Sequence, residues 1–549
     1  MRLPGWSISL AMLGALLSPL GALAQAPVDA AAGAVEASPI GAPAAVVPGA
    51  VAPGPFGAAD VQPGDIQPGD VQPGDPQAAA TQPPESKPAA GKPPARNKKS
   101  FWGELSKIGG LLLIVTLVLM RLPRVGEVSH SAKFRIRRVA NWLPLGLTYA
   151  LLYMGRYNLT VAKNALGDLM TTEDFGFIFG VGTVVYGISF VLNGPLTDRF
   201  GGRFAILMAA AGAGTMNLLM GWATAHGDLS DPKATFTLLY AGNMYFQSFG
   251  AVAIVKVNSS WFHVRERGVF GAIFGILISL GVYLAFDVSR IIIDASSVPW
   301  GFYAPAFLLL GFFVVCFFLV RNTPGDAGVT DFDTADASSG DDGPRLPVFE
   351  VAKRMLSNPI IVTIAAIEFC SGFLRNAIMH WYIIFAKQTD QMASFVPQNW
   401  GLLLCCAGIL GGVFAGVISD HVFQSRRGPV ATVLYGGMFL GAVGLTFVLA
   451  TPWVGWLVTF MSMCIIGVHG MLSGTASMDF GGRKNVGVAV GLIDAMVYLG
   501  TGLQSFLYGQ ILPSGAEGKV AGNWYLWPLA MVPVALIGLV LARRVWHAK

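Results

Sequence analysis

Twelve long apolar segments constrain the fold of this chain more than any other feature of its sequence. Each is 22 residues or longer, enough for an α-helix to cross the roughly 30 Å hydrocarbon core of a bilayer. Backbone polar groups inside a bilayer must hydrogen-bond within the protein, so such segments predict transmembrane helices. The segments are residues 139–162, 175–196, 203–224, 234–256, 268–292, 299–320, 359–386, 398–419, 429–450, 453–477, 485–512 and 523–545.

The composition supports an all-α membrane protein. Of the 549 residues, 54% are hydrophobic and only 12% are charged, which excludes an ordinary soluble globular protein. The net charge of +5 does not indicate a nucleic-acid partner, because the basic residues lie mainly between the apolar segments. The five cysteines lack the spacing of a metal site or a disulfide framework, so we expect them to pack within helices, with no metal or cofactor.

The first 130 residues differ in character from the rest. Residues 1–24 resemble a secretory signal peptide, with a short uncleaved anchor as the alternative. Residues 25–100 are rich in Ala, Pro and Gly and repeat the sequence QPGD, which predicts a disordered linker. Residues 104–122 are predicted to form an extra transmembrane helix, although their apolar run is short enough to lie at the membrane interface instead.

Basic residues in alternate connections predict the orientation of the chain. Under the positive-inside rule the arginine-rich connections and the C-terminus are cytoplasmic. A polar, Asp-rich stretch, residues 321–357, separates six apolar segments from six. We therefore expect two six-helix halves, residues 138–320 and 358–545, joined by a cytoplasmic linker.

Four charged residues within the apolar segments are singled out as candidates: Arg156, Arg375, Glu368 and Asp494. An ionised side chain at the bilayer centre costs on the order of 2.5 to 3.5 kcal/mol even on the lenient insertion scale, so each is a functional candidate. Arg156 and Arg375 lie 17 and 16 residues after the first residues of their segments, and hence at similar depth. Two guanidinium groups facing one cavity suit a phosphate dianion. The alternative is that each arginine pairs with a buried acid and only fixes helix packing.

Two loops at equivalent places in the halves, GPLTDRFGGR (194–203) and GVISDHVFQSRRG (416–428), resemble the signature cytoplasmic loop of the major facilitator superfamily. This resemblance implies two six-helix halves with pseudo-twofold symmetry that rock around a central cavity. Charges at facing helix ends would then form a latch that breaks as the halves move, unless they only set the topology. The expected gating residues are Asp198, Arg199, Arg203, Asp420 and Arg427.

Finer matches point to one branch of that superfamily. MGRYNLTVAKN in the first segment and FLRNAIMHW in the seventh resemble segments of the organophosphate:phosphate antiporters, which include bacterial glycerol-3-phosphate and hexose-phosphate transporters. The resemblance covers about residues 138–545. It implies a multi-pass protein of the bacterial inner membrane, a monomer without cofactors, in which Arg156 and Arg375 bind phosphate and Gln247 lines the cavity.

Other residues refine this site. Tyr149 and Tyr153 share a helix face with Arg156, where they either bind the ligand or only pack. Phe190 stands where the antiporters usually have a lysine, and Ile278 where the glycerol-phosphate transporter has its binding histidine. Glu368 and Asp494 are acids that the family pattern lacks, and we assign them to coupling or charge balance. His380 and His469 are expected to be hydrogen-bonded structural residues.

The function expected from this pattern is exchange of an organophosphate, a sugar phosphate or a related organic anion, for inorganic phosphate by alternating access. The first alternative is a membrane sensor for a phosphorylated metabolite, because the family includes a hexose-phosphate sensor. The second is proton-coupled symport of a non-phosphorylated organic anion, with Glu368 and Asp494 carrying protons. The sequence shows no arrangement typical of an enzyme.

Overall fold

The computed structural model describes residues 131–547 except 227–230, 264–266, 335–347 and 424–426, together with five isolated residues between 103 and 113. The expected signal peptide or anchor (1–24) and linker (25–100) lie outside the described residues. So does the helix expected at 104–122, apart from four isolated positions. The regular structure of the described residues is helical throughout.

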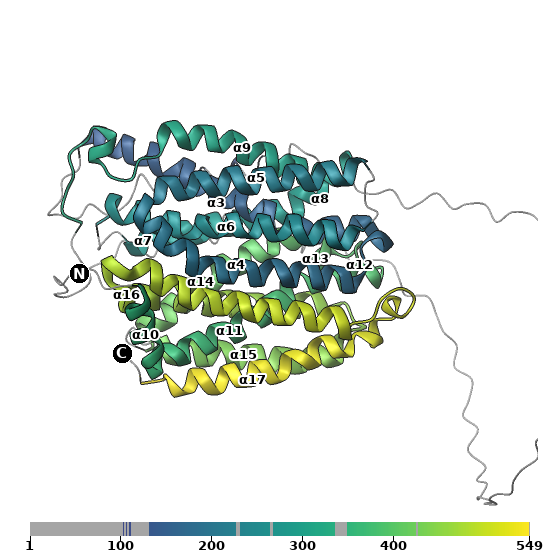
Figure 1. Cartoon of the computed structure of the whole chain (residues 1–549). Coiled ribbons are helices and arrows are strands. Elements are labelled where there is room, and N and C mark those ends of the chain that lie inside the picture. Colours follow the sequence, from purple (N-terminus) through teal and green to yellow (C-terminus); the bar gives the residue numbers. More distant parts are fainter. Residues whose placement is uncertain are drawn as a thin grey trace, which may run out of the picture. The chain divides into compact units, whose positions relative to one another are not determined.

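The helices lie side by side, with those of the first half along one side and those of the second along the other (Figure 1). Side-chain caps begin several of them; Thr171 and Asp174, for example, form a capping box at the start of α4. The first half comprises α3 (Ala132–Leu166), α4 (Thr172–Phe200), α5 (Gly202–His226), α6 (Pro232–Trp261), α7 (Arg267–Tyr283), the π-helical turn η3 (Leu284–Val288), α8 (Ser289–Ala295) and α9 (Trp300–Leu319). The second comprises α11 (Pro359–Met379), α12 (Trp381–Gln388), α13 (Phe395–Gln398), α14 (Trp400–His421), α15 (Arg427–Val448), α16 (Trp453–Ile511) and α17 (Leu526–Arg544).

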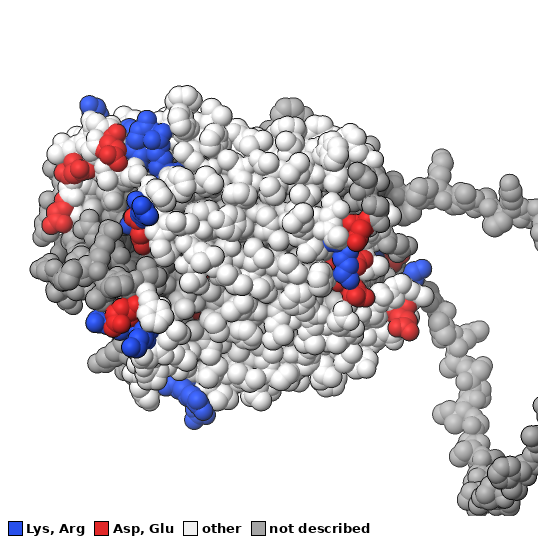
Figure 2. Space-filling model, viewed as in Figure 1, with Lys and Arg blue, Asp and Glu red and all other residues white. Residues whose placement is uncertain are grey.

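The surface is that of a membrane protein. Among the residues that the structure describes, nine helices are long and apolar enough to cross a bilayer. Figure 2 shows that Lys, Arg, Asp and Glu gather at the two ends of the helices, with a broad uncharged belt between them. Each predicted apolar segment lies within helical structure, which confirms the predicted all-α fold. The domain boundaries themselves remain predictions.

Helix α16 differs from the expected pair of separate segments, 453–477 and 485–512, because it is assigned as one helix of 59 residues. If straight, such a helix would be about 90 Å long. Both of its ends nevertheless contact one pair of neighbouring aromatic residues, Tyr382 and Trp527. A Cβ on Gly455 would lie 2.5 Å from the hydroxyl of Tyr382, and the hydroxyl of Tyr508 donates to the carbonyl of Trp527 at 2.7 Å. The rings of Tyr382 and Trp527 are 6.4 Å apart, so α16 folds back on itself. Its two antiparallel arms contain the expected segments 453–477 (first arm) and 485–512 (second arm).

A short helix, α10 (Val348–Ser357), lies within the polar stretch between the halves, where the sequence analysis expected only a linker. Its Met355 is buried against Ile361 at the start of the second half. Phe349 and Leu356 on the same helix remain exposed. This helix is therefore packed against the second half.

The two halves meet along α4 and the second arm of α16, and glycines allow a very close approach there. A Cβ on Gly176 would lie 2.6 Å from the Cα of Gly509, and a Cβ on Gly187 would lie 3.1 Å from the carbonyl oxygen of Ala495. Contacts this short leave no room for a side chain. At these two positions, backbone therefore packs against backbone.

Candidate substrate site between two arginines

Arg156, in the middle of α3, is fully buried and held on every side. Its Nε donates to Gln247 Oε1 at 2.8 Å, Nη2 donates to Tyr186 Oη at 2.7 Å, and Nη1 donates to Tyr498 Oη at 3.3 Å. Its guanidinium also lies 4.6 Å from the ring centre of Tyr153 and 4.3 Å from that of Tyr186. Neutral dipoles and aromatic faces therefore stabilise this charge.

Behind Arg156, a network of amide side chains extends into the first half. Gln247 Nε2 donates to Asn243 Oδ1 at 3.0 Å, and Asn243 Nδ2 donates to the carbonyl of Gly155 at 3.0 Å. Asn217 Nδ2 donates to Asn243 Oδ1 at 3.2 Å and to the same carbonyl of Gly155 at 3.0 Å. All three amides are fully buried. Buried and mutually bonded, they fix Gln247 and through it the guanidinium of Arg156.

Arg375, in α11, has a different environment. Its side chain makes no hydrogen bond or ion pair with any described residue, and its guanidinium lies 6.0 Å from the ring centre of Tyr498. The residue is 9% exposed, compared with 0% for Arg156. A guanidinium carries five N–H donors, and none of those of Arg375 is taken up by a described residue.

The two arginines line the same cavity at the boundary between the halves, together with residues from α3, α4, α6, α11 and α16. Its volume is about 10 Å³, which is room for about one water molecule. A larger anion can enter only if the halves separate. The lining residues are Arg156, Tyr157, Phe179, Thr183, Met244, Arg375, Asn376, Met379, His380, Tyr498 and Thr501.

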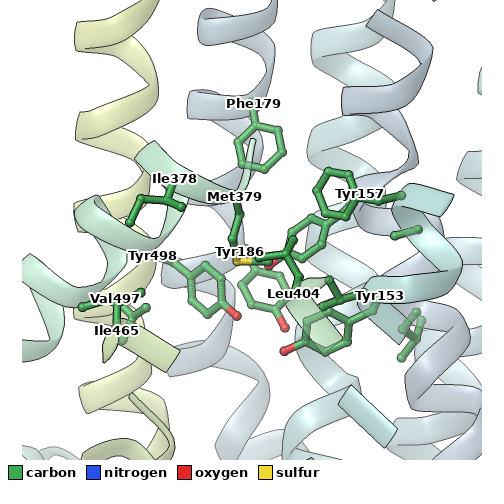
Figure 3. Packing of buried hydrophobic residues seen from close by; sticks show 14 of the residues in the cluster. Tyr153, Tyr157, Phe179, Tyr186, Ile378, Met379, Leu404, Ile465, Val497 and Tyr498 are labelled. Carbon is green, nitrogen blue, oxygen red and sulfur yellow. The ribbon is translucent and has the colours of Figure 1, made fainter. Parts of the chain in front are cut away.

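Aromatic side chains surround this cavity. Figure 3 shows the hydroxyl oxygens of Tyr153, Tyr186 and Tyr498 pointing toward the same space, although these residues come from α3, α4 and α16. The ring of His380 packs edge-on against Tyr157 with centroids 4.6 Å apart. Its Nδ1 is hydrogen-bonded to the hydroxyl of Thr160 at 2.6 Å, which joins α3 to the junction between α11 and α12.

Of the predicted binding residues, the structure brings Arg156, Arg375, Tyr153 and Gln247 together. Tyr149 contacts this group through Tyr153, because the two rings pack with their centroids 5.3 Å apart. Their roles in binding remain predictions.

The predicted coupling acids lie beside this group. Glu368 is fully buried and bonded to His469 Nδ1 at 3.0 Å. Asp494, on the second arm of α16, is near enough to act electrostatically on His469. In the part of the chain that the structure describes, neither Arg156 nor Arg375 forms an ion pair with a carboxylate, so the structure does not show the arginine–acid pairing that the alternative interpretation required.

The predicted gating charges make their contacts within the first half. Asp198 forms an ion pair with Lys256 at 2.6 Å, and Arg203 Nη2 donates to the carbonyl of Phe317 at 2.6 Å. Arg199 lies over the ring of Phe200 at 5.4 Å. The side chains of Asp420 and Arg427 lie outside the described residues, so a latch between the halves at these loops remains a prediction.

Sequence reasoning missed Tyr157, Tyr186, Tyr498 and Asn376 as members of the site. The only sequence signal for these four residues was that each is a polar residue within an apolar segment. Which of them face Arg156 depends on how α4 and α16 pack against α3. Phe190, noted as a departure from the family pattern, stacks on Tyr498 with ring centroids 5.8 Å apart and so lies next to the site.

Comparison with known proteins gives consistent matches over the helical region. The membrane sensor protein UhpC of Salmonella typhimurium is 24% identical over 394 residues, which cover 70% of this chain and 87% of that protein. The glycerol-3-phosphate transporter of Bacillus subtilis is 24% identical over 447 residues, covering 78% and 96%. The phosphoglycerate transporter protein of Salmonella typhimurium is 24% identical over 425 residues, covering 71% and 88%.

Among solved structures, a bacterial homologue of the human lysosomal transporter Spinster, in an inward-facing and unoccupied conformation, has the same fold. The TM-score is 0.56 at 13% identity, covering 76% of this chain and 97% of that chain. The sequence profile of the Major Facilitator Superfamily matches residues 145–505. These residues include both arginines and most of both halves, and the chain belongs to the major facilitator superfamily.

Proposed function

We propose that this protein is a secondary active transporter that exchanges a phosphate ester, of the sugar-phosphate class, for inorganic phosphate. One observation carries the proposal. Among the residues that the structure describes, none accepts a hydrogen bond from the guanidinium of Arg375, which lines a cavity together with Arg156 at the boundary between the two halves. Phosphate accepts paired hydrogen bonds from a guanidinium, and the two negative charges of a phosphate dianion neutralise two guanidinium groups. The named phosphate-ester transporters among the relatives support the same substrate class.

The small volume of the cavity supports alternating access. With about 10 Å³ between the arginines, a phosphate ester can bind only in a state whose halves are further apart. Without an anion, two guanidiniums in a low-dielectric space repel each other and oppose closure. A bound dianion removes this repulsion, so closure and passage between the two faces become coupled to occupancy. We place the protein in the bacterial inner membrane as a monomer, with its C-terminus cytoplasmic.

Counterflow in proteoliposomes tests this function. Labelled phosphate or sugar phosphate outside should enter only vesicles that contain phosphate or a phosphate ester. A matched vesicle loaded with sulfate at the same ionic strength is the control for unspecific anion exchange. Equal uptake into phosphate-loaded and sulfate-loaded vesicles would contradict the proposal.

A second candidate, a membrane sensor, is favoured by the match to UhpC, which covers 87% of that relative. Residues 1–100 are an extension that a partner protein could contact. Removing them should leave phosphate exchange intact if the protein transports, and should abolish partner-dependent signalling if it senses. Failure of counterflow together with retained ligand binding would favour the sensor.

A third candidate, proton-coupled symport, rests on the buried contact between Glu368 and His469. A carboxylate and an imidazole at this distance can share a proton inside the membrane. Uptake driven by an imposed pH gradient, without internal phosphate, would support symport. Its loss in Glu368→Gln would assign the proton to this pair.

A further inference from the structure

Asp287 makes an unusual contact between the two halves. It lies in the π-helical turn η3 of the first half and is 1% exposed. Its Oδ1 accepts from the backbone N–H of Gly401 at 3.2 Å, and its Oδ2 accepts from that of Leu402 at 3.0 Å. These N–H groups belong to the first turn of α14, where they have no partner within the helix and carry partial positive charge. A carboxylate from one half therefore caps a helix of the other.

Arg290 strengthens the same junction from one helical turn further along the chain. Its guanidinium donates to the carbonyl of Pro397 at 2.9 Å and to the carbonyl of Gln398, at the end of α13. It also lies 3.7 Å from the carboxylate of Asp287. Two neighbouring side chains of the first half thus bond four backbone groups around the α13–α14 junction of the second.

The local backbone permits this approach. A π-helical turn shifts the register of the helix, and such turns often occur at functional positions. On the opposite side, Gly401 leaves space for the acid: a Cβ there would lie 3.1 Å from the Cγ of Asp287. A side chain at position 401 would force Asp287 to shift by a few tenths of an ångström.

The junction is also connected to the arginine site. Trp400, the first residue of α14, donates from Nε1 to the carbonyl of Met379 at 2.9 Å and is 1% exposed. Met379 ends α11 and lines the same cavity as Arg375. A ligand that moves the end of α11 therefore also moves the N-terminus of α14. The backbone N–H groups that bond Asp287 lie there.

We propose that Asp287 and Arg290 form a gate that holds the two halves together at the end of the bundle carrying α12 and α13. A cavity of about 130 Å³ beside the junction is lined from both halves by Val161, Asp294 and Lys387, among others. Opening of the gate widens this cavity toward the arginines. The four gate bonds break when the halves separate at this end, and they reform when the halves close.

The experiment measures access to Val161, which lines that cavity and is 8% exposed. Val161→Cys protein is purified, placed in lipid nanodiscs so that both faces are accessible, and labelled with a charged maleimide; protein without the substitution gives the background of the native cysteines. Asp287→Ala removes both charge-assisted bonds to α14, so the labelling rate should rise by at least about tenfold. Asp294→Ala, which removes an exposed acid from the same cavity, is the matched control and should change the rate less than about twofold.

An unchanged labelling rate in Asp287→Ala overturns the gate, as does an equal rise in Asp294→Ala. If Asp287→Ala does not yield folded protein, Asp287→Asn and Arg290→Gln are measured with the same reporter, and unchanged rates in both overturn it equally. The assay needs no ligand, so the gate can stand even if phosphate exchange is not found. Phosphate exchange can likewise stand if the gate fails.

Discussion

The two arginines occupy matching positions in the two halves but have opposite environments. Arg156 donates three hydrogen bonds to neutral partners and is supported by buried amides. Arg375 donates none to any described residue and is partly accessible to the cavity. The difference teaches that similar depth in the membrane does not imply an equivalent role. We infer that Arg156 is a fixed part of the site, whereas Arg375 completes its hydrogen bonding only with a ligand.

The largest expected effect is that of Arg156→Lys, because it damages both binding and the folded structure. A lysine cannot reproduce three directed bonds, so Gln247 and Tyr186 lose their donors in a buried place. Phosphate exchange should fall at least about 100-fold, and stability should fall by about 2 to 4 kcal/mol. Counterflow and thermal unfolding in detergent measure the two effects. Unchanged stability would contradict the view that this arginine is a fixed part of the site.

Arg375→Lys should have a comparable effect on exchange and almost none on stability. The native guanidinium makes no hydrogen bond to the described part of the chain, while a phosphate ligand would lose its paired donors. We expect exchange to fall at least about 100-fold and the stability to change by less than about 0.5 kcal/mol. The same two measurements apply. Normal exchange in this variant would place the anion site elsewhere.

An intermediate effect is expected from Asn243→Ala, which leaves both arginines in place. The substitution removes the oxygen that accepts from both Gln247 and Asn217, and it removes one of the two amide donors to the carbonyl of Gly155. Loss of these buried bonds should cost about 1 to 3 kcal/mol of stability and lower phosphate affinity about tenfold, because Gln247 no longer fixes Arg156. Thermal shift with and without phosphate separates the two. Asn523→Ala, at an exposed amide outside the site, is the control.

The smallest effect is expected from Tyr498→Phe. Its hydroxyl accepts a long bond of 3.3 Å from Arg156, while its ring also faces Arg375. Removing only the hydroxyl keeps the ring, so exchange should fall about two- to fivefold. A loss as large as that of Arg156→Lys would show that this bond between the halves matters more than its length indicates.

Much of the fold could be predicted from hydropathy, because transmembrane helices need length and apolar side chains. The two arginines could also be predicted, since charge in an apolar segment stands out. The partners of these charges could not. Tyr186 and Tyr498 reach Arg156 from α4 and α16, which no local pattern in the sequence indicates, and Glu368 meets His469 from a different helix. The expected gating residue Asp198 also forms an ion pair with Lys256, which no motif singled out.

The glycine contacts between α4 and α16 have a consequence for the speed of the transport cycle. Where Gly176 meets Gly509, no side chain from one half is inserted between side chains of the other. Rocking at this place needs no rotamer change and no withdrawal of a bulky group, so the activation barrier there is set by backbone contacts alone. In the proposed transport cycle, a methyl group added at position 176 would meet the backbone of Gly509, and we expect it to slow turnover.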